Sequence, residues 1–255
     1  MEGVIRVAIL GSSNDIKFDP RTKPLQPDPR CSDCLSELSD DVIRMVGGKA
    51  LAFQEQIRSE TKKILADAEK GGWPSPETAN EILREIRGIS GVDDPYEKMK
   101  SLEMARAKEV FSQVKHHVGN DLRSVTDLAV LGNNIDFFRS MDDALAGISE
   151  QAGNELVYFH DDLDRLQDFL VKEPGLVLYL TDNAGEVFFD LPLFQYIQNL
   201  ALRTVLVVKG GPGLNDLTGA ELESTAISGM FGETMDTGTD GAGIDWRHVS
   251  PAFSS

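Results

Sequence analysis

Two short apolar runs, each followed by a polar turn, constrain the fold of this chain more than any other feature. Leu176–Leu180 reads L-V-L-Y-L and Val205–Val208 reads V-L-V-V, with no polar residue inside either run. Runs of this length and composition are typical of strands buried on both faces, as in a parallel sheet. The intervening Ala184–Leu200 is long enough for a crossover helix. The stretch therefore predicts a strand–helix–strand unit.

Polar side chains follow both predicted strands, at the edge where the carboxyl ends of parallel strands meet. In open α/β sheets, ligands bind beyond this edge. The side chains placed there are those of Asp182, Asn183, Glu186, Lys209, Asn215 and Asp216. A group of oxygen ligands with one ammonium favours a hard metal cation and a phosphate over a nucleotide cradle.

Three of these residues, Asp182, Asn183 and Asp216, together offer two carboxylates and one amide oxygen. Mg²⁺ and Mn²⁺ prefer such ligands and keep several waters for a substrate phosphate. A cation of this kind can polarise a phosphoryl group and activate a water, and Lys209 could balance the phosphate charge. The alternative is that Asp182 and Asn183 cap the following helix, which would be the better interpretation of Asp182 alone. The same kind of group at two strand ends favours the metal site.

A long helical region precedes the predicted sheet. From Leu35 to about Phe138 the apolar residues follow helical spacing, with Gly pairs and Pro residues as breaks. This much helix before the first strong strand indicates a helical subdomain. We therefore divide the chain into an extension at 1–30, a helical subdomain at 31–140 and an α/β domain at 141–255.

A polar segment, G-N-N-I-D-F at 132–137, ends the last helix of this region. One interpretation is a glycine C-cap followed by a turn that the Asn side chains stabilise. The other is a loop that brings Asn133 and Asp136 to the site at the strand ends. The turn by itself does not decide between them.

The charge balance limits the partners of the chain. Its 255 residues include 25 basic and 42 acidic ones, a formal charge of −17. This argues against non-specific binding to nucleic acid or anionic membranes, since both need a basic surface. No apolar run approaches the ~20 residues of a membrane span, and residues 1–12 lack the long apolar core of a signal peptide. We therefore expect a cytoplasmic protein.

The chain's two cysteines, Cys31 and Cys34, form a C-x-x-C pair. Such a pair can be a redox dithiol, half of a zinc site, or two packed small residues. No second Cys or Cys/His pair completes a tetrahedral site, because the adjacent His116 and His117 would face different ways on a helix. We favour packing or an incidental disulfide, and we expect both thiols to stay outside an all-oxygen metal site.

Taken in order, these motifs resemble a known family, the metal-dependent damage-control phosphatases formerly catalogued as domain of unknown function 89. The combination of D-N-A-G-E with G-N-x-I-D is specific, and the C-x-x-C pair points to the archaeal-type subfamily. The matching stretches are Cys31–Cys34, Asp94–Tyr96, Gly132–Phe137, Thr181–Glu186, Val208–Pro212 and Asn215–Asp216.

The resemblance implies a Rossmann-like α/β/α sandwich with an N-terminal helical subdomain. It also implies hydrolysis of small phosphorylated metabolites, such as sugar phosphates or damaged phosphometabolites. The divalent cation would be Mn²⁺, Mg²⁺, Co²⁺ or Ni²⁺. The metal ligands expected from the resemblance are Asp182, Asn183 and Asp216.

Further roles follow from the same resemblance. The expected catalytic residues are Asp182, Lys209 and Asp136. The expected substrate-binding residues are Asn133, Glu186 and Lys209. The resemblance assigns no role to Cys31 and Cys34.

One departure from the family pattern bears on activity. Members usually continue into a further strand that ends in a Lys-Gly…Asn motif, whose lysine faces the phosphate, whereas this chain reaches Ser255 without that motif. We therefore expect a fragment or a divergent member that binds Mn²⁺ yet turns over slowly. A sheet that ends early also has an unpaired edge, which favours self-association.

Two alternative functions stay open. The first is a family member that binds metal without turnover. The second is a nucleotide-binding, Rossmann-type oxidoreductase, although no G-x-G-x-x-G follows either predicted strand.

Overall fold

A computed structural model of the chain describes residues 7–10, 28, 30–46, 51–135, 140–172, 175–201, 203–244 and 248–254. These residues form two compact units, which we call the sheet unit and the helical unit. The sheet unit contains the described parts of Met1–Asn14, Met99–Gly210 and Asn215–Thr237. The helical unit contains the described parts of Asp15–Lys98, Gly211–Leu214 and Gly238–Ser255.

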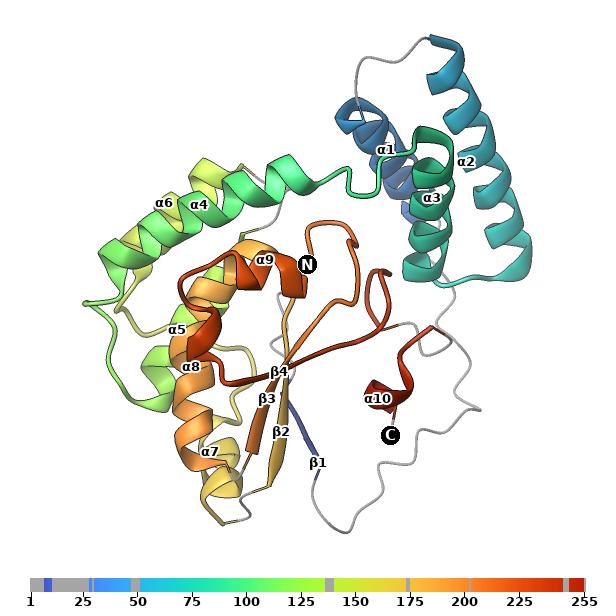
Figure 1. Ribbon diagram of the computed structural model, residues 1–255. Coiled ribbons are helices and arrows are strands. Elements are labelled where there is room, and N and C mark those ends of the chain that lie inside the picture. The colour runs from blue at the N-terminus through green and yellow to red at the C-terminus, as the bar shows by residue number, and fades with distance from the viewer. Residues whose placement is uncertain are drawn as a thin grey trace. The chain divides into compact units, whose positions relative to one another are not determined.

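Three helices build most of the helical unit (Figure 1). They are α1 (Arg30–Met45), α2 (Leu51–Gly71) and α3 (Ser75–Ser90). Their apolar residues recur at helical spacing and are buried, among them Val42, Ile57 and Ile82. The helix α3 opens with proline in its first turn, as the sequence predicts, and Gly91, with φ of 67°, caps its end. The helix therefore continues past Gly88, the glycine that precedes this cap in the sequence.

Two glycine-containing loops lie against α3 within the helical unit. Arg87 donates a hydrogen bond to the carbonyl of Pro212 (2.9 Å) and pairs with Asp240 (3.0 Å). Asn80 accepts a hydrogen bond from the backbone N–H of Ala242 (2.6 Å). A Cβ added at Gly213 would lie 2.5 Å from a backbone oxygen of Asp240, so this approach requires glycine. A short helix, α10 (Pro251–Ser254), completes the described unit.

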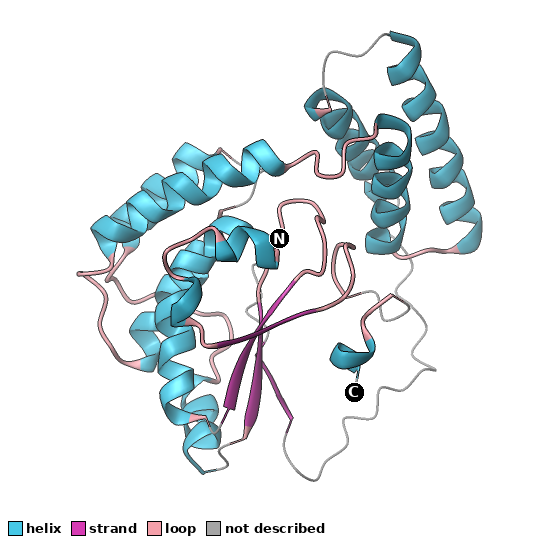
Figure 2. Cartoon of the chain, in the orientation of Figure 1, coloured by secondary structure: helices cyan, strands magenta, loops and turns pink. Residues whose placement is uncertain are grey.

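The sheet unit contains four strands in the order β1-β2-β3-β4 (Figure 2). They are β1 (Val7–Leu10), β2 (Leu176–Leu180), β3 (Arg203–Val208) and β4 (Glu233–Asp236). The strands β2, β3 and β4 are parallel, and β1 pairs antiparallel with β2. The predicted strand–helix–strand unit is confirmed, because α8 (Val187–Leu200) connects β2 to β3.

Burial along the strands corrects one expectation from the sequence. In β3, every residue from Thr204 to Val208 is buried, as predicted for a central strand. In β2, Val177 and Tyr179 are buried but Leu178 and its two neighbours on the same face are only half-buried. The apolar run at 176–180 therefore does not belong to a strand that is equally buried on both faces.

Besides α8, the described helices of the unit are α4 (Glu97–Val114), α5 (Leu122–Gly132), α6 (Met141–Gln151), α7 (Leu163–Lys172) and α9 (Gly219–Glu223). The helices α5, α7 and α8 lie along one face of the sheet (Figure 1). Edge-to-face aromatic pairs join these layers, with Phe194 between Tyr179 of β2 and Phe231. Because α8 is apolar on nearly every side, it forms the centre of the core.

The structure thus confirms a mixed α/β fold that is mostly helical, with a group of helices in its N-terminal half and a small parallel sheet. In the described part of the sheet unit, the helices packed on the sheet share one face, so a third layer stays a prediction. The domain limits at 31–140 and 141–255 also stay predictions. Among the described helices, none has the length and apolar character needed to cross a membrane.

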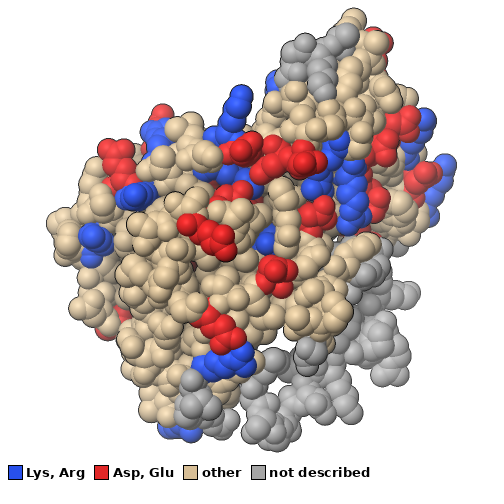
Figure 3. Space-filling view, viewed as in Figure 1, with Lys and Arg blue, Asp and Glu red and all other residues tan. Residues whose placement is uncertain are grey.

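The surface visible in Figure 3 carries acidic and basic side chains interspersed with one another. Ion pairs also occur along the helices, such as those of Lys63 with Glu60 and of Arg84 with Glu81. Exposed pairs of this kind stabilise a fold by little, at most ~1 kcal/mol each. On this face, the described residues form no continuous basic surface.

Two helical glycines predict opposite effects of a Gly→Ala change, one where α5 packs on α8 and one in α6. A Cβ at Gly132 would lie 2.6 Å from Cβ of the buried Phe189. Gly132→Ala should therefore lower the free energy of unfolding by about 1–3 kcal/mol, because the core must shift. Gly147 in α6 has open space around its Cβ position, with the nearest atom at 4.0 Å. Gly147→Ala should raise stability by about 0.5–1 kcal/mol.

Urea unfolding of both variants measures the two changes. Equal stability of Gly132→Ala and the wild-type protein would contradict the close packing of α5 on α8.

Candidate functional site

Backbone hydrogen bonds join the loops that follow β2 and β3. The N–H of Leu217 donates to the carbonyl of Asp182, and the N–H of Ala184 donates to the carbonyl of Asn215, both at 2.8 Å. Asn183 and Asp216 consequently form an isolated antiparallel bridge. The expected meeting of these two loops is therefore present at the carboxyl ends of the parallel strands.

An ion pair between Lys209 and Asp216 lies at this junction. The two charged groups are 3.1 Å apart, and both residues are less than a tenth exposed. Burial raises the pKa of Asp216 to about 6, the charges of Lys209 and Lys100 oppose that rise, and the charge of Asp182 adds to it. The carboxylate of Asp216 thus depends on nearby positive charge to remain ionised.

The side chain of Asn183 is held in one orientation. Its Nδ2 donates to the carbonyl of Ile135 (2.9 Å) and to Oε1 of Glu186 (2.6 Å). Oε2 of Glu186 accepts a second hydrogen bond, from Nδ2 of Asn133 (2.9 Å). Because both N–H donors of the Asn183 amide are used, Oδ1 is the atom that can accept a hydrogen bond or bind a cation.

Three acidic side chains near this amide, those of Glu186, Asp190 and Asp182, interact through their charges. Burial, followed by the charges of Asp190 and Asp182, raises the pKa of Glu186 well above its ordinary value. Burial likewise raises the pKa of Asp190 to about 7, against the hydrogen bond that Tyr179 donates to it at 2.8 Å. Asp182 contributes to the raised pKa of both groups, so its charge lies close to them.

This donor set fits a hard divalent cation. Asp182, Asn183 and Asp216 lie on the two adjoining loops, and their two carboxylates carry more negative charge than Lys209 offsets, an excess that a bound cation would reduce. Among the described residues, no group of three or more Asp, Glu, His and Cys side chains is arranged to hold a metal. The predicted set differs from such a group, because it comprises Asp182, Asp216 and the carboxamide of Asn183.

In the competing interpretation, Asp182 and Asn183 cap the following helix, and the structure describes the hydrogen bonds of Asn183. Asn183 occupies the N-cap position of the 3-10 turn Ala184–Glu186, which precedes α8, but its side chain makes no capping hydrogen bond. Its donors are directed to Ile135 and Glu186 instead. The capping interpretation therefore does not account for this amide.

The structure describes the surroundings of some of the other predicted site residues and not of others. Asn133 ends α5 and contacts Glu186, so the polar segment after this helix does reach the site. Asp136 lies outside the described residues. Asn215 is buried, and its Nδ2 has no hydrogen-bond partner among the described residues. Asp182 is exposed, unlike the other predicted ligands.

The cysteine pair belongs to the helical unit. Cys31 is half-buried and Cys34 is exposed, both in the first two turns of α1. Both are free thiols. The incidental disulfide considered for the sequence is therefore not formed in this structure.

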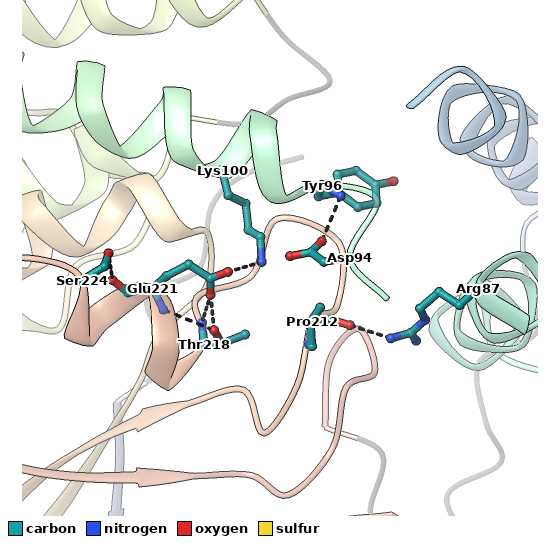
Figure 4. Close-up of polar contacts among 8 residues, drawn as sticks. All are labelled: Arg87, Asp94, Tyr96, Lys100, Pro212, Thr218, Glu221 and Ser224. Carbon is teal, nitrogen blue, oxygen red and sulfur yellow. Dashed lines mark hydrogen bonds and ion pairs between the residues drawn. The ribbon is translucent and has the colours of Figure 1, made fainter. Parts of the chain in front are cut away.

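The sequence reasoning missed two charged residues on α4. Lys100 is fully buried and pairs with Oε1 of Glu221 at 2.5 Å (Figure 4). Glu103, one turn later, is 1% exposed and accepts a hydrogen bond from the N–H of Gly185 (2.8 Å). A signal was present, since both occupy positions that share the apolar face of α4 with the buried Met104.

The fold and the site define the class of protein. It is a mixed α/β protein in which acidic side chains and a lysine meet beyond the carboxyl edge of a small parallel sheet. A family model described as "Damage-control phosphatase ARMT1-like domain" matches residues 28–255. The chain therefore belongs to the damage-control phosphatase ARMT1-like family, and the resemblance inferred from its motifs is confirmed.

Three curated archaeal proteins are similar to this chain. The damage-control phosphatase PH1575 of Pyrococcus horikoshii is 32% identical over 227 residues, which cover 88% of this chain and 77% of that protein. A damage-control phosphatase of Archaeoglobus fulgidus is 28% identical over 196 residues, covering 74% and 67%. The uncharacterized protein MJ0202 of Methanocaldococcus jannaschii is 26% identical over 248 residues, covering 93% and 79%.

A solved structure shares the fold. The crystal structure of a DUF89 family protein (PH1575) from Pyrococcus horikoshii matches with a TM-score of 0.77 and 24% sequence identity. The match covers 89% of this chain and 79% of the solved chain. The mixed α/β architecture is therefore common to the two proteins.

The buried Asp190 predicts a pH-dependent effect on stability. Its pKa is about 7 in the folded protein and 3.8 without burial. Its contribution to stability is therefore complete below about pH 4, is lost as pH rises through about 7, and changes little above that. Asp190→Asn keeps an oxygen that can accept from Tyr179 and cannot ionise. The variant should gain stability relative to wild type as pH rises.

Urea unfolding at about pH 4 and about pH 8, with a chelator present, measures this difference. A difference between variant and wild type that is the same at both pH values would contradict a raised pKa at Asp190.

Proposed function

We propose that this protein is a divalent-metal-dependent phosphatase that hydrolyses small phosphorylated metabolites, such as sugar phosphates or damaged phosphometabolites. The observation that carries the proposal is the bridge between Asn183 and Asp216, beside the ion pair of Asp216 with Lys209. It places two of the proposed metal ligands and a cation on adjoining loops. Membership of the damage-control phosphatase ARMT1-like family supports the reaction class.

The names of two relatives agree with this reaction class. Two of the similar archaeal proteins are called damage-control phosphatases. We extend that activity to this chain because its motifs at the strand ends have the expected residue types. We also propose the family's α/β/α arrangement and a cytoplasmic location for the whole protein.

The proposed metal ligands are Asp182, Asn183 and Asp216. These residues would hold a divalent cation, which would act as a Lewis acid toward the phosphoryl oxygen and would lower the pKa of a coordinated water. Glu186 keeps Oδ1 of Asn183 available by accepting from its Nδ2. The carboxylates offer charge, and the amide offers a neutral oxygen, which together suit Mn²⁺, Mg²⁺, Co²⁺ or Ni²⁺.

The proposed substrate contacts surround these ligands. Lys209 would bind the anionic phosphate, because a charge-assisted hydrogen bond to phosphate is stronger than a neutral one. Asn133 and Glu186 would shape the substrate side of the site. Asp136 is proposed as a further catalytic residue on the strength of the family motif alone.

The activity test compares phosphate release from a generic phosphate ester with and without Mn²⁺, using the 255-residue chain. Metal-stimulated release supports the proposal. Mn²⁺ binding without release would favour a metal-binding member that lacks turnover, and absence of both would overturn the proposed function.

The ligand assignment predicts a graded loss of metal binding. Asp182→Ala removes a charged ligand and should abolish Mn²⁺ binding, together with phosphate release. Asn183→Ala removes a neutral ligand and should weaken binding less. Calorimetric titration with Mn²⁺ measures both. If the Asp182 variant bound Mn²⁺ as tightly as wild type, the assignment of Asp182 would be wrong.

We predict that the two thiols are not needed for phosphate release. A variant with both Cys31→Ser and Cys34→Ser should keep its Mn²⁺-stimulated phosphate release, since thiolates prefer softer ions than an oxygen site does. Circular dichroism establishes that the variant is folded. Complete loss of release in a folded variant would show that the cysteine pair has a role at the site.

A further inference from the structure

A buried ion pair connects α4 to the loop that carries Asp216. Lys100 is 0% exposed, and its Nζ lies 2.5 Å from Oε1 of Glu221. The other carboxylate oxygen, Oε2, accepts hydrogen bonds from the backbone N–H of Thr218 at 2.8 Å and from its hydroxyl (Figure 4). Thr218 and Glu221 thereby form the capping box that starts α9.

The same loop continues directly into the proposed site. Thr218 is two residues after Asp216, and the intervening Leu217 donates its N–H to Asp182 and accepts from the N–H of Lys209 (2.9 Å). A chain of contacts therefore runs from Lys100 through Glu221 and Thr218 to the segment that presents Asp216. Each contact in this chain belongs to the sheet unit.

A contribution to stability alone does not explain why a lysine is buried at position 100. Its neighbours on the inner face of α4 include Met104 and Ala107, which are buried and apolar. Desolvating a charge pair costs free energy that the attraction between the charges often only offsets, so apolar residues of similar volume frequently stabilise a core equally well. Orientation of a functional loop is a use that an apolar residue cannot supply, because only the ion pair has a directed partner.

We propose that Lys100 is a positioning residue of the site, which fixes the 215–218 segment through Glu221 and Thr218. This proposal rests on the proposed function for its consequence, the orientation of Asp216 toward a cation. In this proposal Lys100 acts through Glu221 and Thr218 and not by binding the cation or the substrate. The geometry of the loop can be tested whether or not the protein is a phosphatase.

Three variants separate positioning from simple stabilisation. Lys100→Met removes the ion pair with Glu221 and leaves the half-buried Glu221 carboxylate without the positive charge of Lys100. The double variant with Lys100→Met and Glu221→Gln removes both charges and keeps the capping box, because Gln serves at this position as Glu does. Arg106→Met is the matched control, since Arg106 lies on the same helix and its ion pair with Asp142 is at the surface.

Two measurements are made on each variant. Hydrogen exchange of the peptide covering residues 209–223 reports the local opening of the loop. Calorimetric titration with Mn²⁺ alone reports the orientation of Asp216. Urea unfolding provides the stability against which both are compared.

We expect Lys100→Met to speed exchange in 209–223 and to weaken Mn²⁺ binding about 10- to 100-fold, the usual effect of losing a residue that orients a ligand. The double variant should regain stability, because no unpaired charge is left, yet keep fast exchange and weak binding. Arg106→Met should match wild type in both measurements.

Two outcomes would overturn the proposal. One is wild-type exchange in Lys100→Met, and the other is recovery of exchange and affinity together with stability in the double variant. If the wild-type protein bound no Mn²⁺, the proposed function would fail. The exchange of residues 209–223 would then still decide whether Lys100 holds the loop.

Discussion

The site depends on the segment Asn215–Leu217 of the loop that follows β3, because this segment pairs with the loop that follows β2. Its carbonyl and N–H groups bind Ala184, Asp182 and Lys209, so the backbone itself joins the two strand ends. The positions of the side chains at the site then follow from this backbone arrangement. Because Asp216 is fixed opposite Asn183, small changes in this segment would move both proposed ligands at once.

Charge is the second constraint. Burial raises the pKa of Asp216, Glu186 and Asp190, and the charge of Asp182 adds to each rise. The positive charges of Lys209 and Lys100 oppose this accumulation of acidic groups. Many carboxyl groups and few cations lie close together here, and burying carboxylates without enough positive charge costs free energy. A bound cation would lower that cost, which is the physical reason for expecting one.

The strength of the sequence signals differed among elements. Periodicity predicted the core of the sheet and the limits of Leu176–Leu180 as the structure has them. The ends of helices are harder to predict, because caps such as Gly91 after Ser90 depend on local geometry. The half-buried face of β2 was not predictable, because a run of apolar residues does not reveal which face the helices cover.

The sequence by itself determined which loops meet, since parallel strands joined by a crossover helix must bring their carboxyl ends to one edge. It therefore gave Asp182, Asn183, Lys209 and Asp216 as neighbours. Only the tertiary structure decided how they are held. The amide of Asn183 is oriented by Glu186 and Ile135, and the loop after β3 is tied to Lys100, 121 residues from its partner Glu221. Contacts over such separations arise from packing, which no local pattern encodes.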